Sequence, residues 1–230
     1  MKQPRLHFIT AIVPVFNEEK TVKNVVRVLL KSNLVNEIIC INDGSTDKST
    51  KILQSYKDEV QVISFKNNHG KGYALAKGIN AARGDIVVLI DADLTNLSEK
   101  YLQTLLKPVL EENYKAVLGY PSNSWTPDLF SNLTGERVYY KRDLLPHLTK
   151  ISVTRFGVEV YLNNLFPSQY VKKIPLTNLR GLYKYEKRNS KDTLKEYFNE
   201  ALEVGREIGK KEIVSPAVNF KSWVFRKIYD

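Results

Sequence analysis

The stretch Ile86-Val87-Val88-Leu89-Ile90-Asp91-Ala92-Asp93 joins the longest unbroken apolar run of the chain to two acidic residues. Aliphatic residues that follow one another without polar alternation are typical of a strand buried on both faces of a parallel sheet. In open α/β sheets, ligands bind just beyond the carboxyl ends of such strands. The stretch therefore predicts a parallel sheet with an acidic site at its carboxyl edge.

Strand-like and helix-like segments alternate on both sides of this stretch. Apolar residues run continuously in the first kind of segment and recur at helical spacing in the second. We expect strands at residues 8–15, 38–41, 60–65, 86–90 and 116–120, and helices at 18–31, 47–56, 73–82 and 97–112, with Asn17 as the N-cap of the first helix. The alternation predicts an α/β fold in which helices flank a mostly parallel central sheet.

The pattern is less regular after residue 120. Pro, Asn, Ser and Asp are frequent between residues 121 and 134, which predicts a long loop of the kind that closes over a site. Beyond this loop we expect helices at 135–148 and 157–166, a strand at 171–176 and an amphipathic helix at 193–209. The length of 230 residues fits a single domain.

Asp91 and Asp93 form the strongest candidate site. Residues two apart in an extended backbone project to the same side, so both carboxylates can reach one divalent cation. A hard cation held by carboxylates keeps its other positions for water and phosphate oxygens, which suits a diphosphate leaving group. The alternative is a solvated turn in which the two aspartates only cap a helix.

Two loops are expected beside these aspartates, because both follow parallel strands at the same edge of the sheet. They are Pro14-Val15-Phe16-Asn17-Glu18-Glu19 and Asn42-Asp43-Gly44-Ser45-Thr46-Asp47. Asp43 can accept a hydrogen bond from a nucleobase, and helix-start amides can hold anions. Gly70-Lys71-Gly72 opens another helix, where Lys71 can meet a phosphate. The alternatives are loops that only cap helices, and an exposed lysine in a flexible glycine loop.

Composition limits the class of protein. Apolar residues make up 43% and charged residues 26%, as in ordinary globular proteins. The longest apolar run is far shorter than the roughly 20 residues of a membrane span, and the N-terminus shows no secretory signal. A net charge of +10 favours anionic partners, but no interleaved basic and aromatic motif indicates nucleic acid. The lone Cys40 lies in an apolar run, so we expect a cytoplasmic protein.

Taken together, these motifs resemble glycosyltransferase family 2 and its relatives of the GT-A fold. The resemblance rests on residues 13–19, 41–47, 67–72 and 83–93, and covers about residues 8–120. It implies a Mg²⁺ or Mn²⁺ ion at Asp91 and Asp93 that bridges the diphosphate. It also implies a donor site that comprises Pro14, Val15, Phe16, Asn17, Glu18, Asp43, Gly44, Lys71, Asp91 and Ala92.

Residues 134–137 and 156–159 look like the acceptor half of polyprenyl-phosphate glycosyltransferases and of glucosyl-3-phosphoglycerate synthases. This resemblance implies that Gly135, Glu136 and Arg137 border the acceptor and that Glu159, Glu136 and Asp93 are catalytic. The alternative for Glu159 is a helix residue paired with a lysine. Relatives often supply a late histidine to the metal; no histidine follows His147 here, so Tyr183 or a water would replace it.

The expected domain is therefore a single GT-A unit over residues 1–230. It divides into a nucleotide-sugar-binding half at 1–120, an acceptor half at 121–185 and a helical extension at 186–230. The basic and aromatic segment 220–229 makes contact with the inner membrane surface an open alternative, as is homodimer formation.

The expected function is metal-dependent transfer of a hexose from a nucleotide-diphosphate sugar to an unidentified acceptor, either a polyprenyl phosphate or a small phosphorylated molecule. The reaction can invert or retain the anomeric configuration, and an inverting reaction would use Glu159 or Glu136 as the base. The alternatives are a sugar nucleotidyltransferase and a catalytically idle nucleotide-sugar-binding module.

Overall fold

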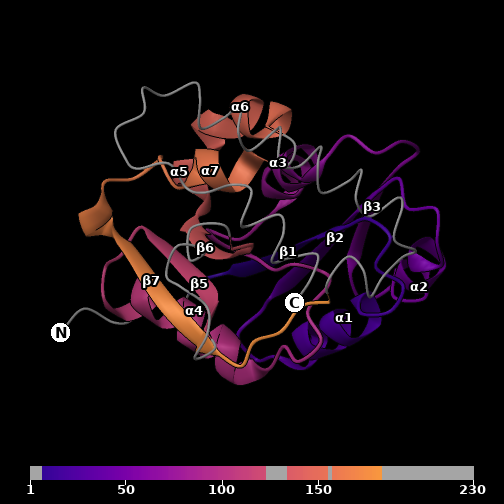
Figure 1. Cartoon of the computed structure of the whole chain (residues 1–230), viewed down its shortest axis with the longest axis horizontal. Coiled ribbons are helices and arrows are strands. Elements are labelled where there is room, and N and C mark those ends of the chain that lie inside the picture. The colour runs from indigo at the N-terminus through magenta and orange to yellow at the C-terminus, as the bar shows by residue number, and fades with distance from the viewer. Residues whose placement is uncertain (1–6, 123–133, 155–156, 183–230) are drawn as a thin grey trace, which may run out of the picture.

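The computed structural model describes residues 7–122, 134–154 and 157–182 of the chain, and these form a seven-stranded sheet with helices on both sides (Figure 1). The strands are β1 (Ile9–Val15), β2 (Glu37–Asp43), β3 (Gln61–Phe65), β4 (Ile86–Leu89), β5 (Ala116–Ser122), β6 (Glu136–Tyr140) and β7 (Val171–Thr177). The α-helices are α1 (Val22–Lys31), α2 (Ser49–Gln54), α3 (Lys71–Ala81), α4 (Glu99–Glu111), α5 (Lys141–Leu144), α6 (Leu148–Val153) and α7 (Val158–Leu162). Two 3-10 helices, η2 (Leu145–His147) and η4 (Ser168–Tyr170), complete the described elements.

The strand order is β3-β2-β1-β4-β6-β5-β7. β1 pairs in parallel with both β2 and β4, while β6 runs antiparallel to its neighbours β4 and β5. The chain builds outward from β1 to β3, then returns through α3 to place β4 on the other side of β1. Loops that leave β1 and β4 therefore diverge, and this is the position at which α/β sheets bind ligands in a crevice.

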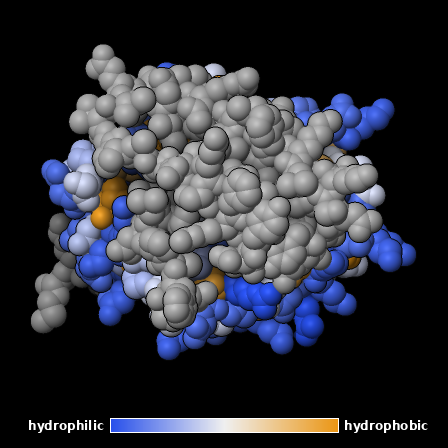
Figure 2. Space-filling model, in the orientation of Figure 1, coloured by the Kyte–Doolittle hydropathy of each residue, from blue (hydrophilic) through white to orange (hydrophobic). Residues whose placement is uncertain are grey.

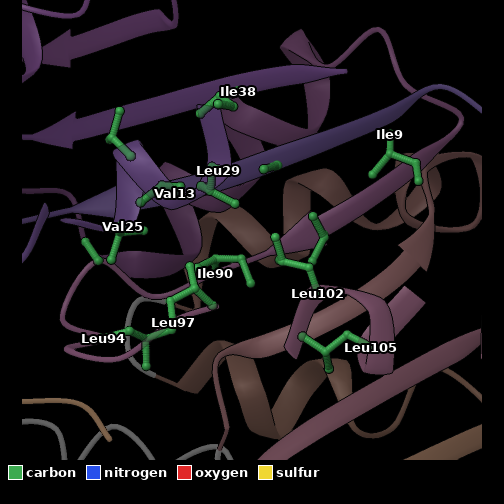
Figure 3. Packing of buried hydrophobic residues seen from close by; sticks show 14 of the residues in the cluster. Ile9, Val13, Val25, Leu29, Ile38, Ile90, Leu94, Leu97, Leu102 and Leu105 are labelled. Carbon is green, nitrogen blue, oxygen red and sulfur yellow. The ribbon is translucent and has the colours of Figure 1, made fainter. Parts of the chain in front are cut away.

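Both faces of the sheet are buried. One core cluster joins alternate residues of β1 and β4 to α1 and α4, and includes Val13, Leu29 and Leu102 (Figure 3). The second cluster joins the other face, with Ile12 and Leu89, to α3, α6 and α7. All four residues of β4 are buried, as its unbroken apolar sequence predicts. The observed α/β fold with a mostly parallel sheet confirms the expected fold class.

The elements of the first half lie where the sequence predicts them, apart from their ends. The first helix begins at Val22 rather than at residue 18, and Asn17 is not its N-cap. Asn17 has a positive φ of 58° and turns the chain toward the loop after β2. Its side-chain oxygen accepts hydrogen bonds from that loop instead of from the helix. The N-cap prediction was wrong because a more distant segment uses the same acceptor.

The helix expected at residues 135–148 is wrong in its first part. Residues 136–140 form β6, which inserts between β4 and β5, and short helical segments begin only at Lys141. Glu136 and Arg137 are buried in this strand, with exposed fractions of 3% and 1%. Charged residues usually indicate an element at the surface, so the sequence alone does not indicate that residues 136–140 form a central strand.

Other expectations are met in part or fall elsewhere. The helix expected at 157–166 is the shorter α7, and the strand expected at 171–176 is β7. The helix expected at 193–209, Tyr183, and most of the loop expected at 121–134 lie outside the described residues. Among the described residues, no helix is long and apolar enough to cross a bilayer. Figure 2 shows the molecule from the same side as Figure 1, and the described residues visible at its periphery are mostly hydrophilic.

Candidate active site

The loops after β1 and β2 are held together at the carboxyl edge of the sheet. The Asn17 side-chain oxygen accepts hydrogen bonds from the Thr46 and Asp47 amides, at 2.8 and 3.3 Å. In return, Ser45 Oγ accepts a hydrogen bond from the Asn17 amide at 3.0 Å. The two loops that the sequence singles out are thus joined by reciprocal hydrogen bonds at this edge of the sheet.

Asp43 connects these joined loops to the start of α3. Its buried carboxylate accepts hydrogen bonds from the amides of His69 and Gly70, the shortest at 2.7 Å. Gly44 follows with a φ of +75°, and a Cβ there would lie 2.6 Å from the Asn67 backbone. Asp43 therefore fixes the loop that ends at the first residue of α3, Lys71.

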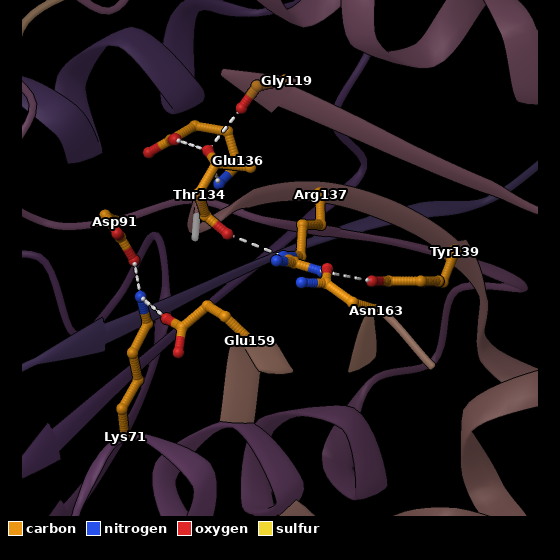
Figure 4. A network of polar contacts seen from close by, with 9 residues as sticks. All are labelled: Lys71, Asp91, Gly119, Thr134, Glu136, Arg137, Tyr139, Glu159 and Asn163. Atoms are coloured by element: carbon orange, nitrogen blue, oxygen red, sulfur yellow. Dashed lines mark hydrogen bonds and ion pairs between the residues drawn. The ribbon is translucent and has the colours of Figure 1, made fainter. Parts of the chain in front are cut away.

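The Lys71 ammonium lies between two carboxylates from distant parts of the chain (Figure 4). Its Nζ is 2.7 Å from Asp91 Oδ1, after β4, and 2.8 Å from Glu159 Oε1, on α7. Burial alone would lower the pKa of Lys71, but the charges of Asp91 and Glu159 outweigh it and hold that pKa above its ordinary value. Lys71 is therefore a fixed positive charge at the crevice, with its side chain 20% exposed.

Gly135 lies directly against Asp91. A Cβ on Gly135 would meet all three atoms of the Asp91 carboxyl group at 2.1 to 2.4 Å, a separation no side chain tolerates. The next residue, Glu136, is buried and lies near both Asp91 and Asp93. Burial, followed by the negative charge of Asp91, raises the pKa of the Glu136 carboxyl to about 8. This environment favours the protonated form of Glu136 over the ionised form.

Asp93 is held by a segment near the end of the described chain. Its backbone oxygen accepts a hydrogen bond from the Leu182 amide at 2.9 Å, and its carboxylate lies beside Gly181. Leu94 and Gly181 form an isolated antiparallel bridge at the same place. Segments after β4 and after β7 therefore meet around Asp93.

The residues present fit a divalent cation. Asp91 and Asp93 offer hard carboxylate oxygens, and the Lys71 ammonium shows that Asp91 already accepts a positive charge at close range. Within residues 7–122, 134–154 and 157–182, no group of three His, Cys, Asp or Glu side chains converges to hold a metal. A cation at these two carboxylates would therefore complete its shell with water and ligand oxygens, as Mg²⁺ commonly does.

The structure does not bring every expected site residue to the crevice through its side chain. Val15 and Ala92 are buried in the core cluster beneath β1 and β4, so only their backbones can face a ligand. Pro14, Phe16 and Glu18 are half-buried at the end of β1. Arg137 follows Glu136 on β6, and adjacent strand residues point to opposite faces, so Arg137 points away from Glu136 to the face that α7 covers, where it donates to Asn163.

Three further residues contact or support the site residues, and the sequence alone assigned none of them a role. Thr134 contacts Glu136 through its hydroxyl, and Asn163 contacts the buried Arg137. Gly181 lies against Asp93. A spacing signal existed for Thr134, which lies two residues before Glu136 in extended chain, and for Asn163, which lies one helical turn after Glu159. Nothing in the sequence indicates that Gly181 returns to Asp93.

Comparison with known proteins identifies the family. Residues 10–160 match the model of glycosyl transferase family 2. An uncharacterised glycosyltransferase, YkcC, of Bacillus subtilis is 30% identical over 62% of this chain and 45% of its own length. The undecaprenyl-phosphate 4-deoxy-4-formamido-L-arabinose transferase of Proteus mirabilis is 31% identical over 49% of this chain and 36% of its own length. The chain thus spans less than half the length of these relatives.

Solved structures support the same fold. Glucosyl-3-phosphoglycerate synthase from Mycobacterium tuberculosis, in complex with Mn²⁺, UDP and glucosyl-3-phosphoglycerate, superposes with a TM-score of 0.67. The match covers 88% of this chain and 78% of that protein at 22% identity, which shows a common fold. The same enzyme has also been solved with Mg²⁺ and UDP. From its matched residues and its fold, this chain belongs to glycosyltransferase family 2.

Proposed function

We propose that this chain transfers a hexose from a nucleotide-diphosphate sugar in a reaction that depends on Mg²⁺ or Mn²⁺. The observation that carries the proposal is the position of the Lys71 ammonium, 2.7 Å from Asp91 and 2.8 Å from Glu159 at the carboxyl edge of the sheet. Three segments far apart in sequence converge there on groups suited to a charged leaving group. The family match and the neighbours crystallised with UDP and metal support this assignment.

The joined loops after β1 and β2 are the proposed nucleoside site. Asp43 accepts backbone hydrogen bonds from His69 and Gly70, yet an ionised carboxylate has about four lone-pair positions in total. It can therefore hold the start of α3 and still accept a hydrogen bond from a nucleobase. Phe16 and Asn17 would border the same nucleoside.

Asp91 and Asp93 would hold the metal ion, which supplies Lewis-acid stabilisation of the diphosphate when bound. Lys71 is the second source of positive charge. When the bond between the sugar C1 and the diphosphate oxygen breaks, the electron pair moves onto the diphosphate. A preorganised ammonium beside that oxygen stabilises the developing charge without reorganising.

Glu159 and Glu136 have different proposed roles. The raised pKa of Glu136 favours its protonated form, which is suited to donate a hydrogen bond to the acceptor. Glu159 is the candidate base, and would take the proton of an acceptor hydroxyl as that oxygen bonds to C1 in an inverting reaction. A phosphate acceptor needs no base, because its oxygen is already ionised. The anomeric configuration of the product, read by NMR, separates inversion from retention.

A phosphorylated acceptor is proposed from the relatives. One sequence relative is named for undecaprenyl phosphate, and one structural neighbour has been solved with phosphoglyceric acid. A polyprenyl phosphate would bring the protein to the cytoplasmic surface of the inner membrane, whereas a small phosphorylated molecule would not. Transfer assays with both acceptor types distinguish these sources.

The test is a panel of nucleotide sugars screened by thermal shift with Mn²⁺, followed by turnover of those that bind. A ligand at about 100 times its Kd adds roughly 2.7 kcal/mol of stability. Asp93→Ala should lower turnover by at least roughly 10²-fold, because a metal contributes several kcal/mol to charge stabilisation. Near-normal turnover in this variant with excess Mn²⁺ would refute the metal role. Binding without any metal-dependent turnover or hydrolysis would indicate an idle binding module.

A further inference from the structure

Arg137 is a fully buried cation on the face of β6 opposite to Glu136. It is 1% exposed, and its guanidinium donates hydrogen bonds to groups that include Thr134, Asn163 and Tyr139 (Figure 4). Nε donates to the Thr134 carbonyl at 2.7 Å, and one terminal nitrogen donates to Asn163 Oδ1 at 2.8 Å and to the Tyr139 hydroxyl at 3.2 Å. Burial of a charge costs free energy unless the charged group is hydrogen-bonded, so a role for this buried guanidinium is worth testing.

The first hydrogen bond acts on the segment that touches Asp91. Thr134 immediately precedes Gly135, whose Cα lies so close to the Asp91 carboxyl group that a Cβ would clash with it. By holding the Thr134 carbonyl, Arg137 fixes the position of Gly135. The backbone at Gly135 in turn limits where the Asp91 carboxylate can lie.

The second hydrogen bond acts on the helix that carries Glu159. Asn163 caps the carboxyl end of α7, and its backbone amide donates to the Glu159 backbone carbonyl at 3.0 Å. Because α7 has only five residues, a restraint on its last turn also restrains its first turn, which carries Glu159. Arg137 thus restrains the helix from which Glu159 reaches Lys71.

We propose that Arg137 is a positioning residue that sets the separation between Asp91 and Glu159, the two carboxylates that hold Lys71. This inference rests on the proposed function for its kinetic consequence. Arginine suits the task because its planar fork presents several donors in fixed directions and it stays charged. A lysine places all its donors on one nitrogen and lacks this fork, in which Nε and a terminal nitrogen meet Thr134 and Asn163 separately. In this proposal Arg137 acts from behind the site, as a positioning residue rather than as an acceptor-binding one.

The test compares two substitutions that each remove one partner of the same guanidinium. Asn163→Ala removes the hydrogen bond between Arg137 and α7. Tyr139→Phe removes the hydrogen bond between Arg137 and a hydroxyl that does not position any site residue. We expect Asn163→Ala to lower kcat by up to roughly 100-fold, because a displacement of about 1 Å at a reacting centre costs on that order. Its donor KM should stay the same. Tyr139→Phe should lose stability and keep kcat. Equal kcat losses in both variants would overturn the proposal.

A conservative variant supplies the rescue. Asn163→Asp keeps an acceptor oxygen for Arg137, and we expect kcat close to the wild-type value. If Asn163→Ala does not fold, Arg137→Lys replaces it, with the same expected fall in kcat at constant donor KM. Full activity of Arg137→Lys would also overturn the proposal, because lysine lacks the separate Nε and terminal nitrogen through which Arg137 reaches Thr134 and Asn163.

Hydrogen exchange separates this proposal from the proposed function. Amide exchange of residues 158–163, followed by mass spectrometry on the full chain, should increase in Asn163→Ala and remain unchanged in Tyr139→Phe. No nucleotide sugar is needed for this measurement. A wild-type protein that turns over no nucleotide sugar would refute the proposed function, while unchanged exchange in Asn163→Ala would refute the positioning role.

Discussion

The two ends of the same parallel sheet both carry clustered charge, but they use it differently. At the amino end, the Glu37 carboxylate accepts hydrogen bonds from Thr10 Oγ1 at 2.6 Å and from the Arg83 amide and Nε at 2.8 and 2.6 Å. One carboxylate meets one guanidinium, and the cluster is closed. At the carboxyl end, the single Lys71 ammonium is shared between Asp91 and Glu159.

The difference is one of charge balance rather than of burial. Among the described residues, Lys71 faces two carboxylates, and Asp93 and Glu136 lie beside them. Two carboxylates thus share one ammonium at this end, whereas the Glu37 carboxylate has a guanidinium of its own. Buried charge by itself therefore does not identify a site, because a balanced cluster is as well explained by stability. An acidic excess at a topological switch point indicates a cation-dependent ligand site.

The largest expected effect comes from Lys71→Met, which removes the ammonium from the acidic end. Turnover should fall by roughly 10²–10³-fold, as is typical when a preorganised donor to a developing charge is lost. Affinity for Mn²⁺ without nucleotide should rise, because Asp91 no longer has a competing cation. Steady-state kinetics and Mn²⁺ titration followed by electron paramagnetic resonance measure the two effects. Unchanged turnover would mean that Lys71 and its carboxylates stabilise the fold without acting in turnover, as proposed for Glu37 at the amino end.

Gly135→Ala should have the next largest effect, because its Cβ would lie 2.1 Å from Asp91 Oδ2. Displacement of that carboxylate should weaken Mn²⁺ binding and lower turnover by roughly 10-fold or more. Gly84→Ala is the matched control, since its Cβ would instead meet the Phe8 carbonyl and Thr10 Oγ1 at 2.6 and 2.7 Å, at the amino end of the sheet. The control should cost about 1–3 kcal/mol of stability through overpacking, with normal Mn²⁺ affinity. Equal Mn²⁺ affinities would contradict the role of Gly135.

Glu37→Gln sharpens the comparison from the amino end. The variant loses charge-assisted hydrogen bonds from Thr10 and Arg83, and should lose roughly 1–3 kcal/mol in the free energy of unfolding. Its kcat per folded molecule should equal that of the wild type, because the cluster lies at the opposite edge of the sheet. Urea unfolding and kinetics on the same sample check both statements. A selective fall in kcat would show that the two ends are coupled.

The smallest expected effect is a pH dependence of stability from the same carboxylate. Burial raises the pKa of Glu37, but hydrogen bonds from Thr10 and Arg83 outweigh it and hold that pKa below its ordinary value of 4.5. The folded state therefore binds the proton less readily than the unfolded state. Its stabilisation is present above pH 4.5 and is lost as the pH falls through the lower folded pKa. Urea unfolding between pH 6 and 3 should show a shallower decline for Glu37→Gln than for the wild type.

The parallel half of the fold was predictable because its signals are local. Unbroken apolar runs indicate strands buried on both faces, and helical spacing indicates the segments that cover them. Asp91 and Asp93 were recognisable because they directly follow the most apolar strand. β6 was not recognisable, because Glu136 and Arg137 are buried only through partners elsewhere, such as Thr134 and Asn163.

The sequence by itself determined the fold class and the acidic, lysine-bearing edge of the sheet, since strand burial and loop position follow from short-range patterns. Only the tertiary structure decided which groups meet there. Lys71, Asp91 and Glu159 come together because α3, β4 and α7 converge, and Arg137 turns away because β6 alternates between faces. Such pairings depend on packing between segments up to about a hundred residues apart, which no local pattern encodes.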